Sequence, residues 1–83
     1  MPCQLYILHS PSKNKYYIGH TCDSLESRLT KHNQKHSGYT AQTNDWEIIY
    51  SEAFETKELA YAREREIKRW KSRKRMLKLI YGD

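Results

Sequence analysis

Tyr6 and Tyr17 are phenol side chains, a residue type that can take part in proton transfer. A free tyrosine has a pKa of about 10 and is therefore a poor base at neutral pH. A nearby cation would lower that pKa, and Arg28 follows soon after the second tyrosine in the sequence. Glu64 and Glu66 are carboxylates much later in the chain. Because these residues are far apart in sequence, they act together only if the fold brings them to one place.

Basic residues gather at the C-terminal end of the chain. Residues 63–83 carry nine Lys or Arg and three acidic residues, whereas residues 1–62 carry six basic and seven acidic residues. The formal net charge of +5 is therefore a local patch. An acidic partner, such as nucleic acid or an anionic membrane surface, would be met at this patch. The basic side chains from residue 68 to residue 75 are Lys68, Arg69, Lys71, Arg73, Lys74 and Arg75.

Length and composition exclude several classes of protein. A chain of 83 residues makes one compact domain, which we place over residues 1–83. No run approaches the roughly 20 apolar residues that span a bilayer, which excludes a membrane protein. The N-terminus has no basic segment followed by an apolar stretch, which predicts no secretory signal and a cytoplasmic location. Cys3 and Cys22 have neither metal-ligand spacing nor the density of a disulfide-rich fold, which predicts reduced thiols.

Tyr6 and Tyr17 need strands to position them. Residues 4–9 and 15–21 are short runs rich in β-branched and aromatic residues, separated by turn-forming residues. This pattern predicts a β-hairpin. With the turn centred directly after Pro11, Tyr6 would lie opposite Tyr17. Side chains alternate along a strand, so both phenols would lie on one face.

A helix is predicted after the hairpin, from Asp23 to about Asn33. Asp23 would be its N-cap, and Glu26, three residues later, completes a pattern similar to a capping box. Residues 34–45 have no periodicity and are predicted to form a loop.

Two functional candidates lie on this first helix. Leu25 and Leu29 mark its buried stripe. Arg28 and His32 are four residues apart and are therefore neighbours beside that stripe. We expect both to point toward the edge of the sheet.

The remaining pattern predicts one strand and two helices. In residues 46–51 the alternation resumes, with Trp46, Ile48 and Tyr50 on one face of a third strand. The sequence thus predicts an α+β fold in which a three-stranded antiparallel sheet is flanked by helices, in the order β-β-α-β-α-α.

The two C-terminal helices carry the acidic candidates and the basic patch. One helix is predicted from a cap at Thr56 to about Trp70, and a shorter one over residues 72–81. Glu64 and Glu66 both flank the apolar stripe of the longer helix, so helical geometry alone does not choose between them.

Five motifs, taken in order, resemble the GIY-YIG nuclease superfamily. They are Gln4-Leu5-Tyr6, Tyr17-Ile18-Gly19 after ten residues, Arg28 with His32-Asn33, Trp46 to Tyr50, and Arg63-Glu64 with Ile67-Lys68. The resemblance covers nearly the whole chain, and the chain is similar to the small stand-alone bacterial members of the superfamily. It extends to the catalytic domains of the excision-repair incision subunit and of GIY-YIG homing endonucleases. The first glycine of the family's motif is replaced by Gln4. The family's fold agrees with the elements predicted above.

The resemblance implies hydrolysis of phosphodiester bonds in DNA with one divalent cation, Mg²⁺ or Mn²⁺. It implies that Glu64 is the metal ligand and that Tyr17 activates or positions the attacking water, with Tyr6 assisting. Arg28 would neutralise the scissile phosphate, and His32 would hydrogen-bond near the nucleophile or phosphate. These residue types suit the reaction, because a metal and a guanidinium stabilise negative charge on phosphoryl oxygens.

The implied partner is DNA, and the six basic residues from Lys68 to Arg75 would follow its phosphates without reading bases. A chain of this length has no separate targeting domain. We therefore expect low sequence specificity or a preference for branched, nicked or damaged DNA, in repair or recombination. A protein partner could supply further targeting. The sequence does not indicate an oligomeric state.

Each candidate also has a structural interpretation. Strand tyrosines commonly pack half-buried, and Arg28 beside a leucine stripe could extend along apolar surface into solvent. His32 near a helix end could interact with the helix dipole, and Glu64 could pair with Lys68 four residues on. His20 is interpreted as structural or exposed.

Two other functions compete with the nuclease. The first is a non-catalytic nucleic-acid-binding module that keeps the fold and the basic patch. The second is a protein-interaction domain without affinity for nucleic acid. The charge asymmetry makes the second the weaker alternative.

Overall fold

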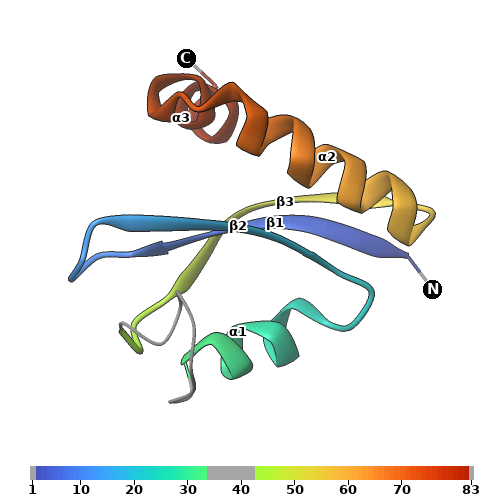
Figure 1. Cartoon of the computed structure of the whole chain (residues 1–83). Helices are drawn as coiled ribbons and strands as arrows, with labels where there is room; N and C mark the ends of the chain where they lie inside the picture. Colours follow the sequence, from blue (N-terminus) through green and yellow to red (C-terminus); the bar gives the residue numbers. More distant parts are fainter. Residues whose placement is uncertain (1, 34–42, 83) are drawn as a thin grey trace.

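The computed structural model describes residues 2–33 and 43–82 (Figure 1). The elements are β1 (Cys3–Ser10), β2 (Lys15–Thr21), α1 (Leu25–Asn33), β3 (Glu47–Phe54), α2 (Lys57–Trp70) and α3 (Arg73–Tyr81). The predicted α+β fold and its element order are confirmed. Within the described ranges, no helix has the length and apolar character needed to cross a membrane.

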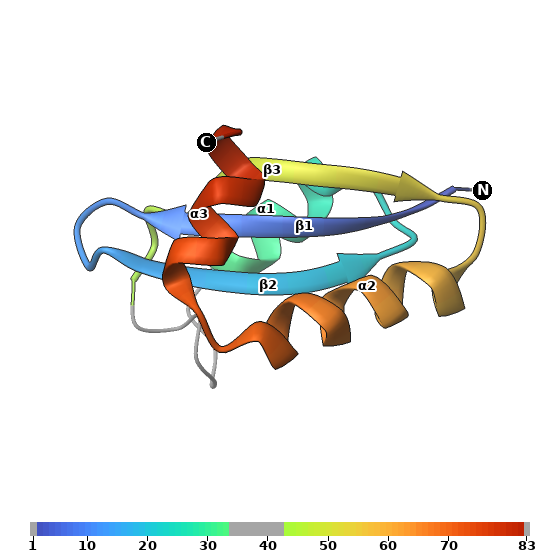
Figure 2. The same ribbon diagram turned by 90° about the horizontal axis from the view of Figure 1, so that it is seen from above.

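The three antiparallel strands, in the order β2-β1-β3, form the middle layer of the molecule. Helix α1 lies on one face of the sheet, and α2 and α3 lie on the other (Figure 1). Seen from above, α3 crosses the strands and α2 runs along β2, which is an edge strand (Figure 2). Side chains of β2 can therefore contact helices on both faces of the sheet.

The central strand β1 separates two packing layers. Leu5 and Ile7 are fully buried and pack against Ile67 of α2 and Met76 of α3. Burying aliphatic side chains of this size stabilises the fold by about 1.5–3 kcal/mol each. Tyr6 lies between the first two in sequence and so points to the opposite face, toward α1.

The hairpin register differs from the predicted one. Tyr6 lies opposite Gly19, and Leu8 lies opposite Tyr17. The prediction that the two tyrosines lie opposite each other is wrong, because the loop extends beyond a tight turn at Pro11 and β2 begins only at residue 15. The difference is two residues, and a shift by an even number keeps every side chain on its face. The prediction that both phenols share one face therefore holds.

A bulge interrupts the pairing of β3 with β1. Ile7 pairs with Tyr50 and the next residue of β1 pairs with Ile48, which leaves Ile49 as the extra residue. Residues that lie opposite each other share a face of the sheet. Ile7 and the next residue of β1 point to opposite faces, so their partners Tyr50 and Ile48 also point to opposite faces. The prediction that Trp46, Ile48 and Tyr50 share one face is wrong, because the bulge shifts the alternation.

The N-cap of α1 is also different from the prediction. The Ser24 hydroxyl accepts a hydrogen bond from the Ser27 N–H at 3.1 Å, and its carbonyl accepts one from the Arg28 N–H at 3.2 Å. The Asp23 N–H instead donates to the Thr21 hydroxyl at 2.9 Å. Asp23 is therefore not the cap, because its backbone still belongs to the turn that leaves β2.

The two C-terminal helices begin where the sequence predicts. The Thr56 hydroxyl accepts a hydrogen bond from the Leu59 N–H, and the Ser72 hydroxyl accepts one from the Arg75 N–H, each at 3.2 Å. Lys71, with a left-handed φ of 49°, separates the helices. Serine and threonine are strong N-caps because their hydroxyls satisfy free N–H groups of the first turn.

Cys3 and Cys22 form a disulfide bond, so the prediction of reduced thiols is wrong. The register explains it, because Gln4 pairs with Thr21 and the two cysteines come next to each other just beyond that pair. Their spacing in sequence carries no such signal. Disulfides are rare in the cytoplasm, and the cytoplasmic location stays a prediction.

Of the predicted loop over residues 34–45, residues 34–42 lie outside the described part of the chain. Asp45, just before β3, is tied to the hairpin loop. Its Oδ1 accepts a hydrogen bond from the Ser10 hydroxyl at 2.6 Å, and its Oδ2 accepts one from the Ser12 N–H at 2.9 Å. Hydrogen bonds from Ser10, Thr43 and Ser12 hold the pKa of the Asp45 carboxyl far below its usual range.

Candidate active site

Tyr6, Tyr17 and His32 form a cluster of three rings between the sheet and α1, here called the ring cluster. The ring centre of Tyr17 lies 6.4 Å from that of Tyr6 and 4.8 Å from that of His32. The Tyr6 hydroxyl and His32 Nε2 share a hydrogen bond of 2.9 Å. Tyr6 is 1% exposed and His32 6% exposed, so this bond is shielded from water.

Tyr6 remains a protonated phenol in this cluster. Burial raises its pKa, while a hydrogen bond from Arg28 acts in the opposite direction. The nearby Tyr17 and Glu64 add to the increase, and the net effect is a pKa above the usual value of 10.0. Tyr6 is therefore suited to donate a hydrogen bond and unsuited to act as a base near neutral pH.

Arg28 reaches the ring cluster from α1. Its Nε is buried and has no hydrogen-bond partner among the described residues. A buried donor without a partner costs about 1–3 kcal/mol, and an oxygen of a bound anion would remove that cost. Arg28 also lines a surface hollow together with Lys57, at the start of α2, and Thr21. Two cationic side chains thus border the same opening.

Gly19 leaves the space that the ring cluster occupies. A Cβ atom at this position would lie 2.8 Å from the Tyr6 hydroxyl oxygen and 2.9 Å from Cε2 of Tyr17. Carbon atoms do not approach other atoms so closely without displacing them. The glycine of the Tyr17-Ile18-Gly19 motif is therefore required by the close approach of the phenols.

Asn33 fixes the end of α1 next to His32. Its side-chain amide donates to the Trp46 carbonyl at 3.2 Å, and its oxygen accepts from the Trp46 N–H at 2.8 Å. His32 is the buried residue of α1, whereas the leucines Leu25 and Leu29 are half-buried. The two residues therefore have different roles. Asn33 fixes the end of α1, and His32 on that helix contributes its imidazole to the ring cluster.

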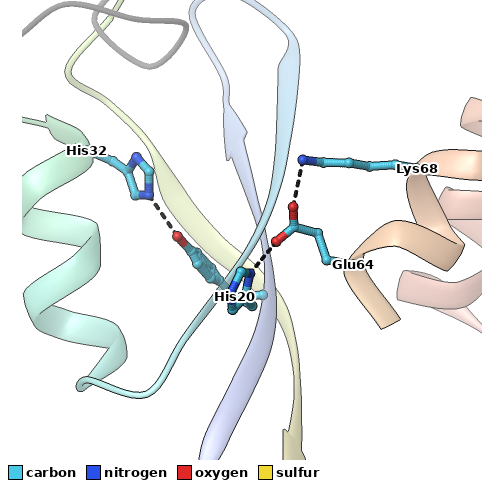
Figure 3. A network of polar contacts seen from close by, with 5 residues as sticks. His20, His32, Glu64 and Lys68 are labelled. Atoms are coloured by element: carbon cyan, nitrogen blue, oxygen red, sulfur yellow. Dashed lines mark hydrogen bonds and ion pairs between the residues drawn. The ribbon is translucent and has the colours of Figure 1, made fainter. Parts of the chain in front are cut away.

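Glu64 approaches β2 from the other side of the sheet (Figure 3). Its Oε1 lies 2.6 Å from Nδ1 of His20, and its Oε2 lies 2.7 Å from Nζ of Lys68. We call Glu64, His20 and Lys68 the carboxylate cluster. The Lys68 ammonium is also 6.0 Å from the ring centre of Tyr17. Lys68 therefore links the carboxylate cluster to the ring cluster around the edge strand.

The structure distinguishes the two carboxylates that helical geometry left open. Glu64 is buried beside β2, whereas Glu66 is exposed and pairs with Arg63 at 3.0 Å. Arg63 also donates two hydrogen bonds to Glu52, at 3.0 and 3.1 Å. These contacts raise the pKa of Arg63, with the hydrogen bond to Glu52 as the largest cause. Glu66 is thus an exposed residue that pairs within α2, with the arginine that contacts β3.

His20 is the site residue that the sequence analysis missed. Alternation on β2 places it on the same face as Ile18, which is the face that α2 covers. The sequence contains that alternation but does not say which face α2 covers. His20 was therefore interpreted as structural or exposed, although it binds the Glu64 carboxylate.

The six basic residues lie at the end of α2 and the start of α3, and all are exposed. They are Lys68, Arg69, Lys71, Arg73, Lys74 and Arg75. Arg73 has contacts of its own, since its guanidinium lies 4.8 Å from the ring centre of Tyr16 and donates to the Asn14 carbonyl at 3.0 Å. Arg75 lies 4.6 Å from the ring centre of Trp70. These two arginines also hold α3 against the hairpin loop and α2.

The chemistry of the donor set bears on whether a divalent ion fits. Within residues 2–33 and 43–82, no three His, Cys, Asp or Glu side chains are grouped so that they could hold a metal. Glu64 offers one carboxylate, and Mg²⁺ is usually bound through one or two carboxylates together with waters and substrate phosphates. The site therefore suits an ion whose coordination is completed by the substrate.

Comparisons with known proteins agree with this fold. The family model of the GIY-YIG catalytic domain matches residues 2–77, and the chain therefore belongs to the GIY-YIG family. It is similar to the UPF0213 protein SSP2268 of Staphylococcus saprophyticus, with 42% identity over 65 residues, or 77% of each chain. No solved structure matches the chain.

Membership of this family gives the chain a nuclease-type fold and a nuclease-type function as its class. GIY-YIG nucleases usually use a divalent metal and act on DNA. The name of the staphylococcal relative states no activity.

Proposed function

We propose that this protein is a metal-dependent endonuclease that hydrolyses phosphodiester bonds of DNA. One observation carries the proposal: the ring cluster and the carboxylate cluster lie on the two sides of β2, and Lys68 contacts both. Tyr6, Tyr17, Arg28 and His32 come from three consecutive elements, β1, β2 and α1, and Glu64 comes from α2, much later in the chain. Family membership supports the same reaction class.

In this proposal each side chain has a separate task. Tyr17, at the junction of the two clusters, positions the attacking water. Tyr6 stays protonated and holds the imidazole of His32 in place through the hydrogen bond between them. Arg28 binds the scissile phosphate with its unsatisfied guanidinium donor. Glu64 holds the divalent ion.

The ion, Mg²⁺ or Mn²⁺, would stabilise the negative charge that the phosphoryl oxygens carry in the transition state. The protein contributes a buried carboxylate, held in one orientation by His20. An orientation fixed before the substrate binds costs no reorganisation during the reaction.

DNA is the proposed partner, and the exposed side chains Lys68, Arg69, Lys71, Arg73, Lys74 and Arg75 bind its phosphates. Such contacts position the duplex and carry no sequence information. We therefore propose weak sequence specificity or selectivity for branched, nicked or damaged DNA, with a role in repair or recombination. The proposal treats residues 1–83 as a single nuclease domain in the cytoplasm, with a protein partner as a source of further targeting.

The test is cleavage of a labelled panel of linear, nicked, flapped, four-way-junction and supercoiled DNA with Mg²⁺ or Mn²⁺. The variants are Glu64→Gln and the matched control Glu66→Gln, which removes the same charge from the exposed side of α2. We expect at least one DNA form to be cut by wild type and by the control, and a loss of about 100-fold or more in Glu64→Gln. Wild-type protein that cuts no form of DNA contradicts the proposal.

A second candidate is a nucleic-acid-binding module without turnover. The observation in its favour is that both oxygens of Glu64 are already occupied by His20 and Lys68. This module would bind DNA with a strongly salt-dependent Kd that Glu64→Gln leaves unchanged, and it would cut no DNA at any metal concentration.

A further inference from the structure

Both oxygens of the Glu64 carboxylate already have a hydrogen-bonded partner. His20 occupies Oε1 and Lys68 occupies Oε2, at 2.6 and 2.7 Å. The carboxylate is largely buried, with a side chain that is 11% exposed. Each oxygen keeps a further lone pair, but a divalent ion on Oε2 would lie next to the Lys68 ammonium, and repulsion between the two positive charges favours the departure of the lysine.

Lys68 is the partner that can leave. His20 belongs to a paired strand, and its side chain is 20% exposed. Lys68 has a long, flexible side chain that is 51% exposed, so its ammonium can move into solvent without disturbing the sheet. A salt bridge of a half-exposed lysine contributes little to stability, so its loss is easily offset by a new partner.

We propose that Lys68 is a latch that weakens the binding of the divalent ion to Glu64 until a phosphate of the nucleic acid offers the lysine a new partner. In the closed state the Lys68 ammonium neutralises Glu64 and lies 6.0 Å from the ring centre of Tyr17. In the open state the ammonium binds a phosphate oxygen and the carboxylate binds the ion. This inference rests on the proposed function, because it assumes that Glu64 is the metal ligand.

The exchange makes the binding of metal and of DNA cooperative. Without DNA, the ion gains one carboxylate and the lysine loses its anion. With DNA, the lysine gains a phosphate, and the ion gains phosphate oxygens that complete its shell. By linkage, each ligand strengthens the binding of the other by the same factor. A nuclease of this design binds the metal more tightly when substrate is present.

The direct test is Mn²⁺ affinity, measured without DNA from the electron paramagnetic resonance signal of free Mn²⁺. Lys68→Met removes the latch and keeps the aliphatic chain, whereas Lys78→Met removes a lysine that lies on α3, outside the site. We expect Lys68→Met to bind Mn²⁺ about two- to fivefold more tightly than wild type, and Lys78→Met to match wild type. Thermal unfolding of each variant verifies that it is folded.

A second measurement adds a duplex whose phosphorothioate linkages resist cleavage, with Glu64→Gln as the baseline for Mn²⁺ held by the DNA itself. We expect the duplex to tighten Mn²⁺ binding more in wild type than in Lys68→Met. Equal or weaker Mn²⁺ binding by Lys68→Met in the absence of DNA overturns the latch, even if Glu64→Gln has lost the ion. If Glu64→Gln binds Mn²⁺ as well as wild type does, both the latch and the proposed metal ligand are wrong.

Discussion

The two sides of β2 hold the candidate site in different ways. On the α1 side, the ring cluster has two buried members, Tyr6 and His32, which share a hydrogen bond, and Tyr17 is half-buried. On the α2 side, the carboxylate cluster consists of ion pairs around Glu64, with Lys68 half-exposed. The first arrangement has one fixed geometry, whereas the second can exchange its partners. A reaction on a charged substrate needs both properties.

The position of β2 at the sheet edge explains the difference. Burying charges in the middle of the fold costs several kcal/mol per ion, so ion pairs that must exchange partners belong near solvent. The α2 side is near solvent because α2 runs along an edge strand (Figure 2). The ring cluster instead packs on the central strand through Tyr6, where water is excluded. The same strand thus carries a rigid and an exchangeable side.

The largest expected effect concerns the disulfide, which anchors the end of β2 on which both sides depend. Cys3→Ser opens a loop with a sequence separation of 19 residues. The chain-entropy model gives a loss of about 3 kcal/mol in the free energy of unfolding. Urea denaturation with and without reductant measures it, and reductant should bring wild type to the level of the variant. Identical unfolding of the two proteins without reductant would show that the bond does not form in solution.

The next effect tests how rigid the α1 side is. Gly19→Ala places a Cβ 2.8 Å from the Tyr6 hydroxyl, and we expect a loss of about 2 kcal/mol together with most of the cleavage rate. Gly82→Ala is the control, because its Cβ would contact nothing within 4 Å. Its φ of 79° makes alanine cost about 1 kcal/mol there, without an effect on cleavage. Equal effects of the two substitutions on cleavage would contradict a tightly packed ring cluster.

A smaller effect is expected when the hydrogen bond of the ring cluster is removed. Tyr6→Phe leaves Nε2 of His32 without its partner in a buried site, and we expect a loss of about 1 kcal/mol in the free energy of unfolding. Tyr61→Phe, at an exposed position on α2, is the matched control. Thermal denaturation of both variants, with the cleavage rate at neutral pH, checks the prediction. A Tyr6→Phe variant that is as stable and as active as its control would assign the hydrogen bond no role.

The smallest expected effect concerns the pH dependence of stability at Glu52, which accepts hydrogen bonds from Arg63 of α2. Burial would raise the pKa of Glu52, but hydrogen bonds from Arg63 and Tyr50 outweigh it and lower the pKa below the usual value. The resulting stability is present above the unfolded-state pKa of about 4.3 and is lost as the pH falls through the lower folded-state pKa. Glu52→Gln should cost about 0.5 kcal/mol at pH 7 and make the acid limb of stability less steep. An unchanged pH profile of urea denaturation would contradict this.

Local features of the fold could be predicted from the sequence, and features that depend on pairing could not. The cap Thr56 was predictable because a hydroxyl and the next turn of helix suffice. The register of the hairpin, the bulge at Ile49 and the Cys3–Cys22 bond depend on how separate segments meet. The prediction that Tyr6 and Tyr17 share one face was still correct, because a register error of two residues preserves the alternation of side chains along the strand.

The candidate site follows the same division. The order of the motifs identified the ring cluster and Glu64, since each side chain stands within its own short motif. His20 could not be found in this way, because its role depends on α2 lying over one face of β2. Lys68 was considered both as a phosphate-binding residue and as a partner of Glu64, and the structure shows it as that partner.

The central claim is that the two sides of β2 act in one step, and a double-mutant cycle tests it most directly. Single-turnover cleavage is measured for Tyr17→Phe, for Glu64→Asp, which keeps the charge but shortens the side chain, and for the double variant. Residues that act as a unit lose activity non-additively. We expect the double variant to be scarcely slower than the slower single variant. If the two losses multiply, the two sides act independently, and the site described across β2 is not one catalytic unit.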